Sequence, residues 1–189
     1  MRPIVRYALP PLVLIAGIVI APNVLPVLPV DSFIRYQALN RIKAPKTETF
    51  ATADLPQLYA DMFGWPEMTA TVARVYHSLT PEEQREAAIY AVDYGEAGAI
   101  DFFGPRYGLP KAVSGHMSYY IWGPPKHEVK VVVAINGEEK DYRKAFARVD
   151  RVATVGTKYS MPGEHVPVFI CREPKAPLNQ FWPRIKLYR

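Results

Sequence analysis

Cysteine is almost absent from this sequence, which contains only Cys171. A single thiol cannot form an intrachain disulfide, so a disulfide-stabilised scaffold is excluded. Cys171 ends the apolar run 166–171, which favours a buried strand thiol over a nucleophile. The histidines also lack the spacing of metal ligands, as His77, His127 and His165 illustrate. We therefore expect neither a metal site nor a cofactor.

Long runs of one charge are absent as well. The chain has 23 basic and 18 acidic residues, a net charge of +5, but the basic residues do not cluster as phosphate binding requires. We therefore expect no nucleic-acid partner. Two short basic patches, 35–46 and 184–189, are flanked by apolar residues. They suit a face close to anionic lipid headgroups, with ordinary solvated charge as the alternative.

The overall composition is that of a folded protein. Hydrophobic residues make up 49% and charged residues 22% of 189 residues, which excludes a disordered tail and a wholly membrane-embedded bundle. This length suits one domain with a single core. Proline occurs 19 times, about twice its usual share of ~5%. From this abundance we expect rigid turns and no long uninterrupted helix.

Charge is missing altogether from residues 7–30, where Asn23 is the one strongly polar side chain. About 24 residues are enough to cross a hydrocarbon core of ~30 Å as a helix. Three prolines in the second half predict that the helix proper covers 11–21 and that an extended segment follows. Arg2 and Arg6 precede the span, so the positive-inside rule places the N-terminus in the cytoplasm. The chain is thus predicted to be a single-pass protein of the cell inner membrane whose C-terminal domain is periplasmic or extracellular.

A cleaved signal peptide is the alternative interpretation of the same segment. Residues 19–21, Val-Ile-Ala, have the small-residue pattern of a cleavage site. Pro22 follows directly and argues against cleavage, because its ring suits an extended protease substrate poorly. Either interpretation places the folded part outside the cytoplasm.

Three regions are expected: a transmembrane anchor at 1–30, a juxtamembrane helix and linker at 31–53, and an extracytoplasmic domain at 54–189. In the last region, apolar runs predict strands at 88–92, 112–115, 129–135, 149–155 and 166–171. Helical spacing predicts helices at 55–62, 65–79, 81 onward, 99–103, 138–146 and 178–188. Thr80 and Glu83 have the spacing of a capping box. The alternation predicts an α/β fold, a small open sheet with helices on both faces.

Glycine, acidic and aromatic residues concentrate in 93–110, where the first strand meets the next helix. In open α/β sheets ligands bind outside the carboxyl ends of the strands. Glycine-rich turns favour anions at a helix start, but Glu96 would repel a phosphate. Glu96 suits a sugar hydroxyl or an ammonium group, with Tyr94 or Tyr107 stacking on a ring. The alternative is that Glu96 caps its own helix.

A second polar and aromatic patch lies at 114–124, directly after the next strand. His116 with Glu96 or Asp101 would form an acid-base pair if the side chains meet. His116 as a ligand contact, or as a structural histidine, is the alternative. Catalytic residues remain unassigned, and the candidate ligand-binding residues are Tyr94, Glu96, Asp101, Arg106, Tyr107, His116 and Trp122.

These patches resemble a known family. The segments that carry the resemblance are 93–101, 104–110, 114–116 and 122–124, together with 26–29 and 55–65. They are similar to the C-terminal extracytoplasmic domain of bacterial family 39-type glycosyltransferases, which include protein O-mannosyltransferase-like and aminoarabinose transferase-like membrane enzymes. The resemblance covers the chain from about Pro26 to its end.

The resemblance implies a multispan enzyme that uses a polyprenyl-phosphate sugar and carries its catalytic acid in an early extracytoplasmic loop. No residue of this chain matches that loop, so no catalytic residue is carried over. The expected role is acceptor binding or assembly beside a multispan glycosyltransferase, with the membrane and a glycan or lipid-linked sugar as partners. A fragment of a longer protein and a free-standing domain are both consistent with this. The alternatives are a self-sufficient carbohydrate-active enzyme using Glu96, Asp101 and His116, and a glycan- or peptidoglycan-binding module.

Overall fold

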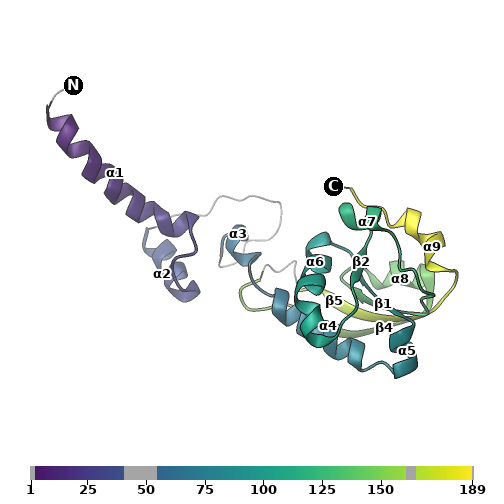
Figure 1. Cartoon of the computed structure of the whole chain (residues 1–189). Coiled ribbons are helices and arrows are strands. Elements are labelled where there is room, and N and C mark those ends of the chain that lie inside the picture. The colour runs from purple at the N-terminus through teal and green to yellow at the C-terminus, as the bar shows by residue number, and fades with distance from the viewer. Residues whose placement is uncertain (1–2, 41–54, 161–164, 189) are drawn as a thin grey trace. The chain divides into compact units, whose positions relative to one another are not determined.

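The structure is a computed structural model that describes residues 3–40, 55–160 and 165–188 (Figure 1). Its contacts divide the chain into two units, Met1–Ala60 and Asp61–Arg189. Each unit is described by itself.

The first unit begins with a long apolar helix, α1 (Pro3–Val24). It continues through Pro10, Pro11 and Pro22, so the expected restriction to 11–21 and the exclusion of long helices were wrong. Proline has a helical φ, and its cost is a missing N–H and a local clash that this helix accommodates. The 18 residues Tyr7–Val24 have a mean hydropathy of 1.8 and are long and apolar enough to cross a membrane.

Among the described residues of this unit, two short helices follow, α2 (Val30–Asn40) and α3 (Gln57–Ala60). The Phe33 ring stacks on Tyr59 with centroids 4.7 Å apart, and the Tyr59 hydroxyl donates to the Pro22 carbonyl at 2.9 Å. These contacts hold α2 and α3 to the end of α1. The predicted linker and its Asp54 cap lie outside the described residues.

The second unit contains a five-stranded open sheet in its described residues, as the apolar runs predicted. The strands are β1 (Ala87–Ala91), β2 (Ala112–Ser114), β3 (Val131–Ile135), β4 (Phe146–Thr154) and β5 (Pro167–Pro174). Their order is β2-β1-β3-β5-β4. The first three are parallel, whereas β5 runs antiparallel to both β3 and β4. A register shift between Arg151 and Ala153 interrupts the β4–β5 pairing.

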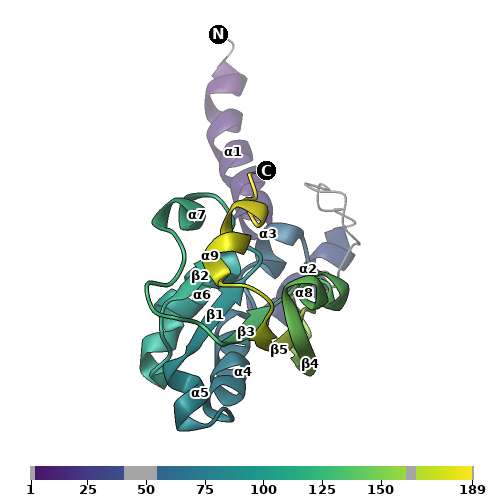
Figure 2. The ribbon, with the colours of Figure 1, turned by 90° about the vertical axis from the view of Figure 1, so that its right-hand side faces the viewer.

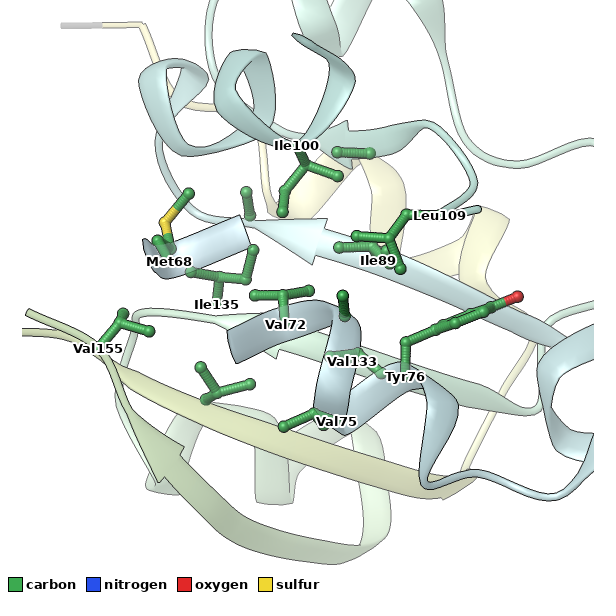
Figure 3. Packing of buried hydrophobic residues seen from close by; sticks show 14 of the residues in the cluster. Met68, Val72, Val75, Tyr76, Ile89, Ile100, Leu109, Val133, Ile135 and Val155 are labelled. Carbon is green, nitrogen blue, oxygen red and sulfur yellow. The ribbon is translucent and has the colours of Figure 1, made fainter. Parts of the chain in front are cut away.

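Side chains of the central strands alternate between two apolar layers. Ile89, Val133 and Ile135 face α4 (Trp65–His77) and α6 (Tyr94–Phe103), as Figure 3 shows for the core on this side. Ala134 and Phe169 face the other layer, with partners from α8 (Glu139–Ala145) and α9 (Leu178–Phe181). Helices therefore cover both faces of the sheet, which confirms the predicted fold class (Figure 2).

Local chemistry explains where the other helices differ from the prediction. Helix α5 (Pro81–Arg85) starts at the predicted capping box. Helix α6 starts at Tyr94 rather than at residue 99, because Asp93 caps it and draws the glycine-rich turn into the helix. The aromatic run after β2 forms a short helix, α7 (Ser118–Trp122), where no helix was predicted. The closing helix stops at Phe181 and continues as the 3-10 turn η3 (Trp182–Arg184), as expected from Pro183.

Candidate ligand site at the carboxyl edge of the sheet

The topology brings three strand ends together. From β1 the chain passes through α6 to β2 on one side and then returns to β3 on the other side of β1. Neighbouring parallel strands whose connections lead to opposite sides leave a crevice beyond their carboxyl ends, where open α/β sheets bind ligands. Asp93, His116 and Asn136 follow β1, β2 and β3 respectively.

Asp93 is the N-cap of α6. Its Oδ1 accepts the Gly95 N–H at 2.6 Å, and Glu96 Oε2 accepts the Asp93 N–H at 3.0 Å. Reciprocal bonds of this kind form a capping box, which satisfies backbone donors that a helix start leaves free. The structure thus places Glu96 in the cap geometry that the sequence analysis gave as its alternative.

The remaining Glu96 oxygen faces Asn136. The Asn136 amide donates to Glu96 Oε1 at 2.8 Å, which ties the start of α6 to the end of β3. Glu96 is buried, with 6% of its surface exposed. Burial raises the pKa of this carboxyl from 4.5 to about 7, against the opposing effect of its hydrogen bonds to Asp93 and Asn136.

Two tyrosines support this end of the sheet. The Tyr142 hydroxyl donates to the Asn136 carbonyl at 2.7 Å, and the Tyr142 ring meets Tyr90 edge-on with centroids 6.4 Å apart. Asn136 has a φ of 67°, in the left-handed region that asparagine tolerates better than most residues. The amide that reaches Glu96 is thereby fixed in position.

His116 is joined to the same cap through Asp93. Its Nδ1 lies 3.0 Å from Asp93 Oδ2, and the Tyr94 N–H approaches the same nitrogen at 3.4 Å. Only one of these contacts can be optimal, because Nδ1 either donates or accepts. The carboxylate contact is shorter and charge-assisted, so Nδ1 carries the proton and donates to Asp93.

The other ring nitrogen of His116 is buried and has no hydrogen-bond partner within the described residues. The three remaining histidines differ, since Nε2 of His77, His127 and His165 each contacts a backbone carbonyl, at 2.8, 3.1 and 3.2 Å. A carbonyl only accepts, so these rings are protonated at Nε2. A neutral His116 therefore has the opposite tautomer, with a free lone pair at Nε2.

The Tyr94 ring is exposed at this site. Its ring meets the imidazole edge-on with centroids 4.9 Å apart, and 54% of its surface is exposed. His116 itself is only 6% exposed. A ligand that reaches Nε2 must therefore displace a covering side chain, and Tyr94 is in ring contact with the imidazole.

The segment near the C-terminus holds the His116 loop in place. The Met117 N–H donates to the Leu187 carbonyl at 3.0 Å, and the Leu187 N–H donates to the Gly115 carbonyl at 2.8 Å. A β-carbon on Gly115 would lie 1.9 Å from the Ile185 carbonyl oxygen, so only glycine is accommodated here.

Asp101 has a different role from the one considered for it. Its Oδ1 accepts the Ala112 N–H at 2.8 Å, and its Oδ2 accepts the Tyr119 hydroxyl at 3.1 Å. Asp101 therefore joins α6 to β2 and α7, and the carboxylate that pairs with His116 is that of Asp93.

The other candidates lie outside the Asp93–His116 cluster. The Arg106 guanidinium lies over the Phe103 ring, 4.9 Å from its centroid, and the Tyr107 carbonyl contacts His77. Trp122 is exposed and packs against Tyr119. A shallow depression of about 580 Å³ is lined by a further set, Ala70, Ala73, Arg74, His77, Ser78 and Tyr107.

Sequence reasoning missed Asp93 and Asn136 as site residues. The spacing of Asp93 and Glu96 is that of a capping box; a cap role was considered for Glu96, but Asp93 was not recognised as its N-cap partner. Asn136 precedes Gly137 directly after an apolar strand, a turn signal that also marks a strand end. The pairing of Asp93 with His116, 23 positions later in the sequence, has no local signal.

The site is thus defined as a switch-point cluster in a mixed α/β sheet. In the part of the chain that the structure describes, no group of three or more histidine, cysteine or acidic side chains is placed to hold a metal ion. Comparisons with protein-family models, with curated proteins and with solved structures found no match to this chain.

Proposed function

We propose that this chain is a membrane-anchored domain that binds a hydroxyl-rich ligand, a sugar, at the carboxyl edge of β1 and β2. The observation that carries the proposal is His116, buried, oriented by Asp93 and unpartnered at Nε2. A buried acceptor without a partner costs about 1–3 kcal/mol. A ligand group that donates a hydrogen bond to Nε2 therefore contributes more binding free energy than the same hydrogen bond would in water.

The chemistry of the site favours a sugar over a phosphate. A neutral imidazole with its proton on Nδ1 accepts a hydrogen bond at Nε2, which a hydroxyl supplies and a phosphate dianion does not. The Asp93 carboxylate beside the imidazole adds negative charge that disfavours anions. The exposed Tyr94 ring supplies an apolar face next to the imidazole, as the C–H face of a sugar ring requires.

The proposed biological setting follows from the resemblance. The domain would stand on the extracytoplasmic side of the membrane and contribute acceptor binding or assembly to a multispan glycosyltransferase. α1 supports the anchoring, and Arg2 and Arg6 support the orientation. Protease added to intact spheroplasts should digest residues beyond Val30, and a protected C-terminal domain would reject this orientation.

The binding proposal is tested by nitrogen NMR of the full chain labelled at histidine. Methyl α-mannoside and methyl β-N-acetylglucosaminide serve as probes. We expect the unprotonated Nε2 signal of His116 to shift on titration with one of them, while the ring-nitrogen signals of His77 and His127 stay unchanged. Asp93→Asn, which offers an amide to Nδ1, should abolish the shift.

His127→Gln is the matched control, because it removes a histidine whose Nε2 already has a carbonyl partner. That variant should bind as the parent does. If neither glycoside shifts His116, or if the shift persists in Asp93→Asn, the sugar-binding proposal fails.

The Asp93–His116 pair also favours a second candidate, a self-sufficient carbohydrate-active enzyme. A carboxylate that orients an imidazole whose other nitrogen is free is the arrangement of a general base. His116 would take the proton of an attacking water or sugar hydroxyl. Turnover of an aryl glycoside by the purified chain, lost in His116→Gln with binding retained, would promote this candidate. Binding without turnover supports the first.

A further inference from the structure

Aromatic and basic side chains gather where α7 meets the segment near the C-terminus. We call it the α7 surface and define it by Tyr120, Ile121, Trp122, Trp182, Lys186 and Tyr188. The Tyr120 ring stacks on Trp182 with centroids 5.7 Å apart, and the Trp182 indole donates to the Tyr120 carbonyl at 3.3 Å. Both views of the ribbon place α7 and α9 next to one another (Figures 1 and 2).

This surface exposes large apolar side chains. Ile121 is 73% exposed, Trp122 69% and Tyr188 51%. Exposed apolar residues scattered singly need no explanation, but a group of them on one surface marks an interaction site. Ile121 and Trp122 follow Tyr120 directly on α7, and the centroid of the Tyr120 ring lies 6.2 Å from that of Tyr188.

The charge of the surface has one sign. Residues 118–125 and 175–188 contain no acidic side chain, whereas the second segment contains Lys175, Arg184 and Lys186. The Lys186 ammonium lies 5.5 Å from the Tyr120 ring centroid and 4.8 Å from that of Tyr188. Asp101 is the carboxylate that contacts α7, and it already accepts a hydrogen bond from the Tyr119 hydroxyl.

We propose that the α7 surface docks the folded domain onto an anionic lipid bilayer; this rests on the proposed anchoring by α1. Tryptophan and tyrosine with neighbouring lysine and arginine are the residues enriched at membrane interfaces. Lysine keeps its charge at the headgroups while its stem lies along apolar surface, as Lys186 does over two rings. Anionic lipids attract each basic residue near the surface. The residue composition of the α7 surface therefore matches a lipid bilayer as its binding partner.

Docking has a consequence for the proposed sugar site. The same C-terminal segment that contributes Lys186 and Tyr188 pairs through Leu187 with Gly115 and Met117, on either side of His116. A docked α7 surface would therefore hold the His116 loop near the headgroups, where a lipid-linked sugar is presented.

The test uses the full chain in nanodiscs made of equal parts phosphatidylglycerol and phosphatidylcholine. Ile121→Cys carries an environment-sensitive fluorophore, and Val152→Cys on β4 is the matched control, because Val152 is also exposed. The native thiol does not interfere, since Cys171 is fully buried. Its failure to react also reports that each variant is folded.

We expect nitroxide-labelled lipids to quench most of the fluorescence at position 121 and almost none at position 152. Adding Arg184→Glu and Lys186→Glu should weaken docking at least about tenfold, since each reversal removes one attraction and adds a repulsion. High salt should act in the same direction.

Equal quenching at the two positions would overturn the proposal, and so would quenching at position 121 that survives both charge reversals. A label at position 121 that responds to a soluble glycan but not to lipid would assign the surface to that ligand instead. Failure of the anchor is seen separately. A chain that does not co-purify with nanodiscs refutes the anchoring, whereas one that co-purifies with an unquenched label refutes the docking alone.

Discussion

The two capping boxes, on α5 and on α6, share the same local geometry, but their glutamates lie in opposite electrostatic environments. In both, the glutamate Oε2 accepts the N-cap N–H at 3.0 Å, from Thr80 in one case and from Asp93 in the other. The first is predicted by the proline at its first helical position and the second by no such signal. The same three-residue spacing therefore gives the same helix start.

The difference lies in what the second glutamate oxygen meets. Glu83 Oε1 accepts from Arg172 Nε at 2.6 Å, and this bond lowers the pKa of Glu83. Glu96 Oε1 accepts from the neutral Asn136 amide, and burial raises the pKa of Glu96 to about 7. A capping motif thus determines backbone geometry, whereas burial and the partner of the outer oxygen determine the charge of the glutamate.

The largest expected effect is a dependence of stability on pH that comes from Glu96. Between pH 4.5 and about 7 the unfolded carboxyl is ionised while the folded one holds its proton, so the free energy of unfolding falls as pH rises. The loss amounts to about 3 kcal/mol when complete. Urea unfolding of the full chain in mild detergent, followed by tryptophan fluorescence, measures it.

Glu96→Gln should flatten this slope, because an amide does not titrate. Glu83→Gln is the matched control and should leave the slope in place. Glu83 has a lowered pKa, so its own contribution has the opposite sign and is lost as pH falls. An unchanged slope in Glu96→Gln would show that Glu96 is ionised in the folded protein.

The two N-cap residues should differ in how much they contribute to the free energy of unfolding. Thr80→Ala removes a cap at an exposed helix start and should cost about 1 kcal/mol. Asp93→Ala also leaves the buried His116 Nδ1 without an acceptor, so its cost should reach about 2–3 kcal/mol. Denaturant midpoints of both variants check this, and equal losses would mean that the Asp93–His116 pair adds nothing to stability.

A smaller effect is expected at the Glu83 partner. Arg172→Gln should lower the free energy of unfolding by roughly 1 kcal/mol or less, since the ion pair is partly solvated. The pKa of Glu83 should then rise toward its usual value, as NMR titration of the carboxyl would show. A pKa that stays low would assign the shift to the Thr80 backbone bond.

The smallest effect separates burial from helix fraying as the cause of the high Glu96 pKa. A β-carbon on Gly98 of α6 meets nothing within 4 Å. Gly98→Ala should therefore stabilise the domain by about 0.5–1 kcal/mol. The pH slope should stay the same, because the environment of Glu96 does not change. A reduced slope would mean that fraying of α6 contributes to it.

The sheet was predictable because its strands are apolar runs separated by glycine, proline and charged residues. Five strands and the capped helix α5 appear where the sequence placed them. The long helix α1 was not predicted, because the abundance of proline was taken to exclude long helices. An apolar setting tolerates proline in such a helix. The short helix α7 was missed because its five residues are too few to show a helical period.

The location of the candidate site was predictable from the sequence, but the full set of residues that form it was not. The strand ends located Glu96 and His116 at one edge of the sheet, and Asp93 connects them there. The roles of Asp101 and Asn136 depend on partners distant in sequence, such as Tyr119 for Asp101 and Glu96 for Asn136. Distant pairs of this kind follow from the packed fold and have no local pattern.

The outer strand β4 bears on how many copies of this chain can share a membrane. A nine-residue edge strand offers unpaired backbone groups to any neighbouring copy. Here the register shift at Arg151 interrupts the edge, and the strand carries exposed basic side chains, Arg148 and Arg151. Chains held by α1 in one bilayer would meet at high local density. An edge strand with these two features disfavours edge-to-edge pairing between such crowded molecules.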